Sequence, residues 1–403
     1  MMWTKAKIGD CCEITSSKRI FFSEYVESGI PFYRSKEIIE LSNCQEIGDP
    51  LYISESKYDE IAHKFGIPQP GDMLLTSVGT IGIPYIVKEK DTFYFKDGNL
   101  TWFRNFNERL DSRYLYYWVK SAEGQGVLNN TTIGSSQKAL TIAALKDLKI
   151  LCPPIGIQNR IVEILTSYDD LIENNQKQIK LLEEVAQRLY KEWFVDLRFP
   201  GHENTKITDG VPEGWRMAVL SEIASVNKES ISKQYPYDYV DYIDIGSVSK
   251  GQISSVTRLS TKDAPGRAKR IAFDGDVLWG MVRPNLKSYA LVFHPKETSV
   301  FSTGFAILHA EKVPFSFLYC HVTQDEFVSY LINCTNGAAY PAVKPSHFEN
   351  AVLLVPTDMV LSKFHSLVGQ MFRQAEILEQ KNQQAIEARD RLLPKLMSGE
   401  IEV

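Results

Sequence analysis

The sequence lacks the features that mark membrane, secreted and metal-binding proteins. No apolar run approaches the ~20 residues needed to cross a bilayer, and the N-terminal residues 1–5 lack the apolar core of a signal peptide. The six cysteines form no C-x-x-C pair, and no histidine stands at zinc spacing beside them. We therefore expect a cytoplasmic protein without a metal site, whose cysteines are buried or partly buried reduced thiols.

Catalytic motifs are also missing. The chain has no G-x-x-x-x-G-K-[ST] phosphate loop, no G-x-G-x-x-G fingerprint, no H-E-x-x-H motif and no G-x-S-x-G motif. Residues 152–155, Cys-Pro-Pro-Ile, resemble the Asn-Pro-Pro-aromatic motif of amino-methyltransferases only superficially. Cys152 replaces the group that must accept a hydrogen bond from the target amine, and Ile155 replaces the stacking aromatic ring. We expect no catalytic residue.

The balance of charge is slightly acidic. The 403 residues carry a formal net charge of −5, whereas a protein that holds nucleic acid by itself normally needs a cationic excess to contact phosphates. Any nucleic-acid function must therefore explain this charge. The length indicates more than one domain.

The second half of the chain repeats the first. Four pairs of segments match in the same order, three of them at an offset of about 204 residues. They are residues 71–74 with 275–278, residues 134–140 with 337–343, residues 145–153 with 348–356, and, more loosely, residues 3–10 with 215–222. One such match would be weak, but four in order indicate an internal duplication.

Each copy begins with a globular part whose short apolar runs, bounded by Gly, Pro, Asn and Asp, indicate mixed, β-rich structure. The predicted strands are residues 73–76, 83–87, 92–95, 149–151, 277–279, 290–293, 305–308 and 352–355. Short helices are predicted near residues 112–121 and 314–328, the former because its apolar residues recur partly at helical spacing.

Each copy ends in a long helical tail. Residues 158–196 contain no Pro or Gly, and apolar residues recur there at alternating steps of four and three, with Asn175 as the polar member of the seam. The second tail, residues 361–391, is free of Pro but less regular. A long helix with an apolar seam needs a partner, so we expect the tails to pack as an antiparallel coiled coil. The predicted seam residues are Leu165, Tyr168, Ile172, Asn175, Ile179, Leu182, Leu189, Met371, Leu378 and Leu392.

The sequence therefore predicts an α+β fold with two β-rich domains joined by two long helices packed as an antiparallel coiled coil. The predicted parts are residues 1–155, the central helix in 156–200, residues 201–356 and the C-terminal helix in 357–403. A helix of about 39 residues would form a rod of roughly 58 Å. Such a rod suits a spacer between two recognition domains.

These segments resemble the DNA-specificity (S) subunit of type I restriction–modification systems. Residues 71–82 resemble its "G-D-I-L…G-T-I-G" pattern, and residues 134–165 resemble its passage from domain into helix, with Ile157 in place of the usual Glu. Residues 211–215 resemble its "P-x-G-W" start of the second half, and residues 392–401 a common C-terminus. The resemblance covers essentially the whole chain. Residues 283–287 depart from the pattern, since no Gly-Thr-x-Gly is present there.

The resemblance implies two target-recognition domains, each reading one half of an asymmetric, bipartite site in double-stranded DNA. It implies helices that set the gap between the halves and dock two methyltransferase (M) subunits, with restriction (R) subunits joining the full enzyme. S-adenosylmethionine, ATP and magnesium would belong to these partners, and this chain would need no cofactor. The partners would clamp the DNA backbone, which accounts for the acidic charge.

Polar and basic loop residues are the candidates for DNA contact, because Arg and Lys suit guanine and Asn suits adenine. They are Arg34, Lys36, Ser77, Thr80, Lys96, Asn99 and Lys138 in the first domain, and Arg283, Asn285, Lys287, Ser302, Thr303, Tyr340 and Lys344 in the second. Lys138 and Lys344 are better suited to phosphate contacts. Residues 79–82 are interpreted as a turn between two strands, whose backbone N–H groups could also meet a DNA phosphate.

Two other interpretations remain open at this point. The chain could be a protein–protein scaffold, with two β-rich domains on a coiled coil, or an enzyme in its own right. The missing catalytic motifs weigh against the enzyme. DNA binding that is salt-sensitive and requires a methyltransferase partner would separate the specificity subunit from the scaffold.

Overall fold

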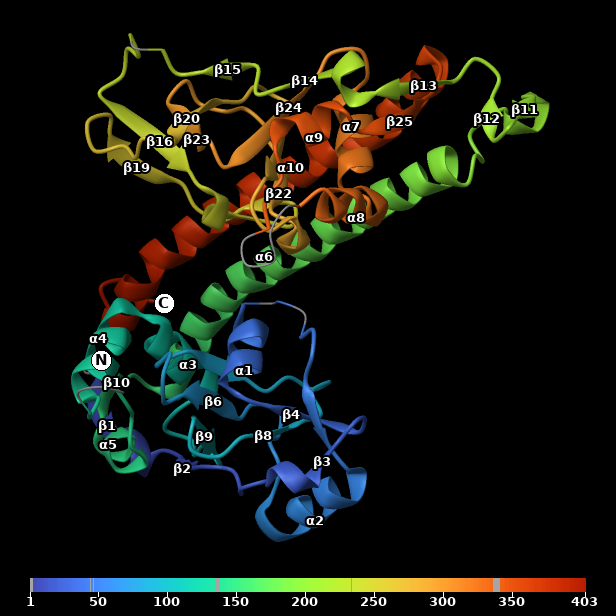
Figure 1. Ribbon diagram of the computed structural model, residues 1–403. Helices are drawn as coiled ribbons and strands as arrows, with labels where there is room; N and C mark the ends of the chain where they lie inside the picture. Colours follow the sequence, from blue (N-terminus) through green and yellow to red (C-terminus); the bar gives the residue numbers. More distant parts are fainter. Residues whose placement is uncertain (1–2, 44, 46, 135–137, 233, 336–340) are drawn as a thin grey trace. The chain divides into compact units, whose positions relative to one another are not determined.

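The computed structural model describes residues 3–43, 45, 47–134, 138–232, 234–335 and 341–403. The chain divides into two compact units: the first is Met1–Asn174 with Lys381–Val403, and the second is Asn175–Gln380. This division cuts through both long helices, α6 in green and α10 in red in Figure 1. The four-part division predicted from the sequence therefore stays a prediction, since the compact units follow different boundaries.

The first unit is built on an antiparallel four-stranded sheet with the order β2-β9-β6-β7. Its strands are β2 (Glu13–Thr15), β9 (Leu100–Arg104), β6 (Met73–Thr76) and β7 (Pro84–Ile86). A second sheet, β3-β5-β4-β8, contains β3 (Tyr25–Val26), β5 (Leu51–Ile53), β4 (Ile30–Tyr33) and β8 (Tyr94–Phe95). A separate ribbon pairs β1 (Thr4–Lys7) with β10 (Lys149–Cys152).

Besides segments of the two long helices, the described residues of this unit form the shorter helices α1 (Ser35–Ser42), α2 (Glu55–Phe65), α3 (Ser112–Lys120), α4 (Ala122–Thr131) and α5 (Ile142–Asp147). The α3 helix begins where the Asp111 side chain accepts hydrogen bonds from the backbone N–H groups of Arg113 and Tyr114. Tyr114, Leu115 and Trp118 are buried in the same core as Met73 and Leu75 of β6. The helix therefore covers one face of the four-stranded sheet.

The second unit repeats this plan. Its antiparallel sheet β14-β24-β21-β22 consists of β14 (Ala224–Val226), β24 (Phe305–Ala310), β21 (Val277–Gly280) and β22 (Tyr289–Leu291). Its ribbon pairs β13 (Arg216–Val219) with β25 (Val352–Val355). Its helices α7 (Phe315–Val322), α8 (Asp325–Asn333) and α9 (Pro345–Glu349) follow in the same order as α3, α4 and α5. The duplication inferred from the sequence is confirmed by these matching strand orders.

The second unit also has a larger second sheet and two short ribbons. The sheet is five-stranded, β15-β20-β23-β16-β19, with β15 (Glu229–Ser230), β20 (Ala268–Ile271), β23 (Ser299–Ser302), β16 (Tyr239–Ile243) and β19 (Thr257–Ser260). Short ribbons pair β17 (Val248–Ser249) with β18 (Gln252–Ile253), and β11 (Ile207–Thr208) with β12 (Val211–Pro212). Within the five-stranded sheet, the order β19-β16-β23 repeats β5-β4-β8 of the first unit, with one antiparallel and one parallel pairing in each copy. In the second copy β20 and β15 extend this shared part of the sheet.

One predicted helix was wrong in its extent. Residues 314–328 were expected to form a single helix, but α7 ends at Val322 and α8 begins at Asp325. Gln324 between them is extended, with φ −64° and ψ 150°. The Thr323 hydroxyl donates to the Tyr319 carbonyl at 2.7 Å, which gives a carbonyl at the C-terminal end of α7 a hydrogen-bond partner.

The long helices are α6 (Ile155–Tyr190), continued by a π-helical turn at Lys191–Val195, and α10 (Asp358–Ser398). The α10 helix continues past the Pro-free stretch 361–391 and through Pro394. Leu393, Leu396 and Met397 are buried in the core of the first unit. Burial of these side chains offsets the backbone hydrogen bond that proline removes.

The two helices are antiparallel, as predicted. In the first unit, Ile161 and Leu165, early in α6, pack in one core with Leu393 and Leu396, late in α10. In the second unit, Tyr190, late in α6, lies 6.1 Å from Phe364, early in α10, between ring centroids. Each unit therefore contains one segment of each helix, running in opposite directions.

Among the seam residues named from the sequence, Leu165 and Leu392 lie in the core of the first unit and Leu189 and Met371 in the core of the second. Ile179, Leu182 and Leu378 form a smaller cluster with Ala375. Leu165, Ile172, Asn175, Ile179 and Leu378 are buried, and Tyr168, Leu182, Leu189, Met371 and Leu392 are partly buried. The sequence did not single out Phe364 and Phe372, which are 0% and 3% exposed. They lie in the less regular tail, where the heptad pattern gives no clear register.

Neither long helix, nor any other helix in the described part of the chain, combines the length and hydrophobicity of a membrane span. Cys11, Cys12, Cys152, Cys320 and Cys334 are free thiols, buried or partly buried as expected, while Cys44 lies outside the described residues.

Candidate nucleic-acid interface

Three segments of the first unit meet at the connection between β6 and β7. We call residues 77–82 of this connection tip loop 1. The Ser77 N–H donates to the Asn99 carbonyl at 2.8 Å, and the Leu140 N–H donates to the Ser77 carbonyl at 2.9 Å. Val78 and Ala139 form an isolated β-bridge. Tip loop 1 therefore lies beside Asn99 and beside the segment that contains Lys138.

The second unit forms the same junction with different side chains. Residues 281–287, between β21 and β22, are tip loop 2. The Met281 N–H donates to the Gly304 carbonyl and the Val343 N–H to the Met281 carbonyl, both at 2.9 Å. Val282 and Ala342 form the matching bridge. The two tip loops are therefore equivalent parts of the duplicated scaffold.

Their backbones share an unusual conformation. In tip loop 1, Gly79 and Gly82 have φ angles of 80° and 81°. In tip loop 2, Arg283 and Lys287 have φ angles of 51° and 54°. The left-handed region is natural for glycine but costs other residues about 1–2 kcal/mol. The second copy has thus lost the Gly-Thr-x-Gly sequence but kept left-handed residues at both ends of the loop.

A helix anchors the end of each tip loop. In the first unit, the Gln125 side chain of α4 donates to the Gly82 carbonyl at 2.7 Å. In the second unit, Lys287 Nζ donates to Asp325 Oδ1 at 2.6 Å, at the start of α8. The same point of the scaffold is held by an amide in one copy and by an ion pair in the other.

The residues predicted around tip loop 1 have different roles. Ser77 is 2% exposed, and its hydroxyl is 2.6 Å from that of Thr101, so it stabilises the loop from within. Thr80 and Lys138 are exposed, and Asn99 is half-buried. Among the four residues predicted around tip loop 1, Thr80, Asn99 and Lys138 therefore have side chains that are accessible to a ligand, and Ser77 does not.

Arg34, Lys36 and Lys96 lie where β4 and β8 end. The Lys96 N–H donates to the Tyr33 carbonyl at 2.8 Å, next to Arg34. The Arg34 guanidinium binds Glu37 at 2.5 Å, and the side chain of Glu37 is only 1% exposed. Arg34 therefore neutralises a buried carboxylate, while Lys96 is exposed and Lys36 pairs at 3.6 Å with Glu40.

The residues predicted in the second unit also divide into exposed and structural ones. Arg283, Asn285 and Lys344 are exposed. Ser302 is 2% exposed, and its Oγ accepts from the Gly304 N–H at 3.2 Å. The half-buried Thr303 has its backbone N–H bonded to the Arg267 carbonyl at 2.8 Å. Tyr340 lies outside the described residues.

Arg267 is a candidate that sequence reasoning missed. Its side chain is 62% exposed, and its Nε donates to the Tyr242 hydroxyl at 3.0 Å. It adjoins Thr303 through the backbone bond to that residue. The signal that could have found it is a basic residue directly after Pro265 and Gly266, before a strand.

The Gly-Asp motif shared by both copies is structural. Asp72 accepts hydrogen bonds from the Gln69 N–H at 2.9 Å and from Trp102 Nε1 at 2.8 Å. Asp276 lies 2.7 Å from both the Phe273 N–H and His309 Nδ1. Burial raises the pKa of each carboxyl group above its usual value. The motif closes the turn into the central strand and offers nothing to a ligand.

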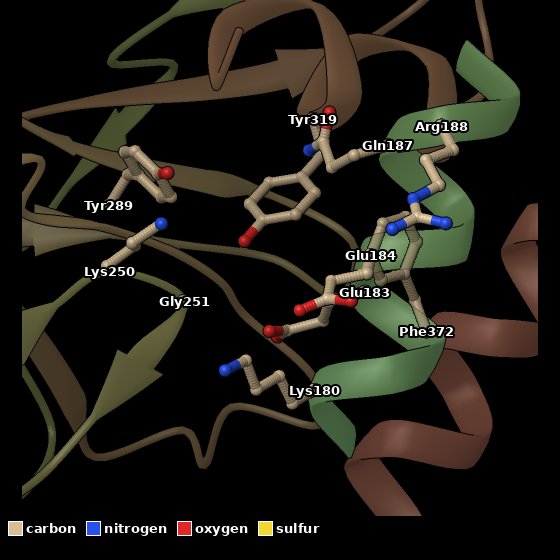
Figure 2. A pocket seen from close by; sticks show the side chains of 10 residues that line it. All are labelled: Lys180, Glu183, Glu184, Gln187, Arg188, Lys250, Gly251, Tyr289, Tyr319 and Phe372. Carbon is tan, nitrogen blue, oxygen red and sulfur yellow. The ribbon is translucent and has the colours of Figure 1, made fainter. Parts of the chain in front are cut away.

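A cavity of about 370 Å³ in the second unit lies between α6 and the turn that joins β17 to β18. In Figure 2 the Glu183 carboxylate and the Tyr319 hydroxyl point into the same space, and Lys250 faces it from the turn. Burial raises the pKa of Glu183 to about 7, although the positive charge of Lys250 opposes this shift. No cluster of three or more metal-ligand side chains occurs among the described residues.

The chain is similar to known specificity subunits. Residues 2–184 match the sequence model described as Type I restriction modification DNA specificity domain. The Type I restriction enzyme MjaIX specificity subunit of Methanocaldococcus jannaschii is 27% identical, with 100% of this chain and 94% of the relative covered. A putative type I specificity subunit of Haemophilus influenzae is 30% identical over 46% of this chain and 45% of its own length.

The fold is shared with a solved structure of the same class. The crystal structure of a type I restriction–modification S subunit from M. genitalium covers 98% of this chain and 96% of its own, with a TM-score of 0.60 and 15% identity. This likeness shows that the two chains share their fold. Residues 2–184 therefore belong to the type I DNA specificity domain family, and the whole chain is similar to specificity subunits of type I restriction–modification systems.

Proposed function

We propose that each unit reads one half of an asymmetric, bipartite sequence in double-stranded DNA. The observation that carries this proposal is the pair of tip loops, which share backbone geometry and scaffold contacts but not side chains. Two identical reading loops would favour a palindromic site. Loops with Gly-Thr-Ile-Gly in one copy and Arg-Pro-Asn-Leu-Lys in the other favour two different half-sites.

The exposed side chains near these junctions, together with the half-buried Asn99, are the proposed DNA contacts. They are Thr80, Lys96, Asn99 and Lys138 in the first unit and Arg267, Arg283, Asn285 and Lys344 in the second. The buried Ser77 and Ser302 and the paired Arg34 support the loops instead. Lys138 and Lys344 suit phosphate contacts because the lysine ammonium group is a point charge on a flexible chain. A phosphate contact does not require a defined direction of approach.

The long helices are proposed to set the distance between the half-sites and to dock two methyltransferase subunits, with restriction subunits completing the enzyme. The partners would hold S-adenosylmethionine, ATP and magnesium, and the complex would act in the cytoplasm. A net charge of −5 supports this division of labour, since the partners would supply the phosphate contacts that this chain lacks. Family membership favours this function over a protein–protein scaffold.

DNA binding with and without the methyltransferase subunit tests the proposal. Fluorescence anisotropy of a labelled duplex should show tight binding by the assembled complex, with affinity falling steeply as salt rises. The chain alone should bind weakly, because its charge is negative. Equal, salt-insensitive binding by both preparations, or no binding by the complex to any duplex, would contradict it.

A further inference from the structure

Arg283 occupies the backbone conformation that Gly79 occupies in the other copy. Gly79 directly follows Val78, which forms a β-bridge with Ala139. Arg283 directly follows Val282, which forms the equivalent bridge with Ala342. Both have positive φ angles, 80° and 51°. Strain of this kind persists at a non-glycine residue only where the surrounding structure imposes it, and it concentrates at functional sites. Glycine would relieve it, yet the chain carries arginine.

Tip loop 2 is fixed on both sides of the exposed Arg283 side chain. The Arg283 N–H donates to the Pro341 carbonyl at 2.8 Å, and Pro284 begins a 3-10 turn over Pro284–Leu286. The loop ends at Lys287, whose ammonium group is held 2.6 Å from Asp325. A fixed backbone directs the base of the arginine side chain and reduces the entropy lost on binding.

We propose that Arg283 reads a guanine in the half-site of the second unit and that Lys287 is a positioning residue rather than a DNA contact. This inference rests on the proposed function. A guanidinium group can donate two parallel hydrogen bonds to guanine O6 and N7, which demands a defined direction. A phosphate contact makes no such demand and would not require arginine at a strained position.

The proposal predicts that removal of the Arg283 side chain lowers DNA discrimination without lowering thermal stability. The substitution Arg283→Gly places in tip loop 2 the residue type that tip loop 1 already uses. The Tm should stay unchanged or rise by up to about 3 °C. In the complex with the methyltransferase subunit, discrimination at one G·C pair of the second half-site should fall roughly 10- to 100-fold. Discrimination in the first half-site should persist.

Two further variants give this experiment its controls. His294→Gly removes another exposed, left-handed side chain from the same unit, with φ 46°, and should leave recognition unchanged. Arg283→Lys keeps the charge without the planar fork and should fail to restore discrimination. Full recognition by Arg283→Lys would instead identify a phosphate contact, and full recognition by Arg283→Gly would remove Arg283 from the interface. Either result overturns the inference while leaving bipartite recognition intact.

A charge exchange tests the role of Lys287. Lys287→Asp alone should weaken recognition of the second half-site, because two carboxylates would face each other and loosen the loop. Adding Asp325→Lys should restore recognition to within about 3-fold, since the ion pair is rebuilt with reversed polarity. If Lys287 touched DNA, the exchange would leave an aspartate against phosphate, and recognition would stay lost. If DNA recognition by the unmodified complex did not depend on both half-sites, the proposed function itself would be overturned.

Discussion

Asp169 of α6 and Arg389 of α10 form an ion pair with 2.6 Å between Oδ1 and Nη1. The side chains are 26% and 16% exposed, and the Tyr117 hydroxyl of α3 also donates to Asp169 at 2.8 Å. One carboxylate thus connects both long helices to the recognition domain of the first unit. In the described part of the second unit, Tyr190 of α6 and Phe364 and Phe372 of α10 lie in one hydrophobic core.

Removal of this carboxylate should destabilise the first unit. Asp169→Ala leaves the largely buried Arg389 without its inter-helix partner, which should lower the free energy of unfolding by about 1–3 kcal/mol. Asp390→Ala is the matched control, because Asp390 also binds Arg389 but is 56% exposed. Urea unfolding followed by circular dichroism measures both variants. Equal, small effects would show that Asp169 does not hold the helices together.

Stability should depend on pH through Glu183. Its pKa in the folded chain is raised to about 7 from the usual 4.5, so the folded state binds the proton more tightly than the unfolded state. This group therefore stabilises the fold below pH 4.5, and its contribution is lost as the pH rises through about 7. Glu183→Gln should flatten this part of the profile and raise stability at pH 8 by on the order of 1–3 kcal/mol.

Thermal unfolding between pH 5 and 8 measures this effect. The exposed neighbour Glu184 provides the control, since Glu184→Gln makes the same change of charge on the same helix. Parallel pH profiles for the unmodified chain and Glu183→Gln would contradict the assignment.

The buried aspartates of the repeated Gly-Asp motif should contribute to folding rather than to recognition. Asp72→Ala leaves the Gln69 N–H and the Trp102 indole N–H without their acceptor, which should cost about 1–3 kcal/mol. Asp59→Ala, at an exposed position in α2, should change stability by less than about 0.5 kcal/mol. Chemical denaturation compares the two, and the sequence specificity of any complex that still assembles should be unchanged.

The helices should act as a spacer. Inserting four residues, about one helical turn, near Gln178 should change the length of the gap recognised between half-sites or destroy activity. Substituting the exposed Gln178 by Ala, without insertion, should have no effect. Methylation of duplexes whose half-sites are separated by different gaps reports the preference. An insertion variant with unmodified activity and gap would refute the spacer.

The sequence predicted the elements whose patterns are local. The strand at Val352–Val355 and the helix at Ser112–Lys120 lie where expected, because an apolar run and an Asp111 cap define them without reference to distant residues. The five-stranded sheet of the second unit was not foreseen. Strands such as Glu229–Ser230 are short and exposed, and their pairing depends on residues far along the chain.

The sequence located the loops of the candidate site, but it did not distinguish the residues that stabilise a loop from those that are accessible to DNA. Loop residues near the tips were identified, but the sequence cannot show that Ser77 and Ser302 point inward or that Arg34 is bound to Glu37. Arg283 illustrates the same limit. Loss of glycine there indicated divergence, whereas the backbone kept its left-handed conformation because the neighbouring bridge and ion pair impose it.

Mapping the methylated adenines in DNA exposed to the assembled methyltransferase complex is the decisive test of recognition by two unlike units. Two different reading loops on one duplicated scaffold predict a single motif made of two unlike half-sites with a fixed gap between them. A palindromic motif, a contiguous motif, or methylation without sequence preference would contradict the account.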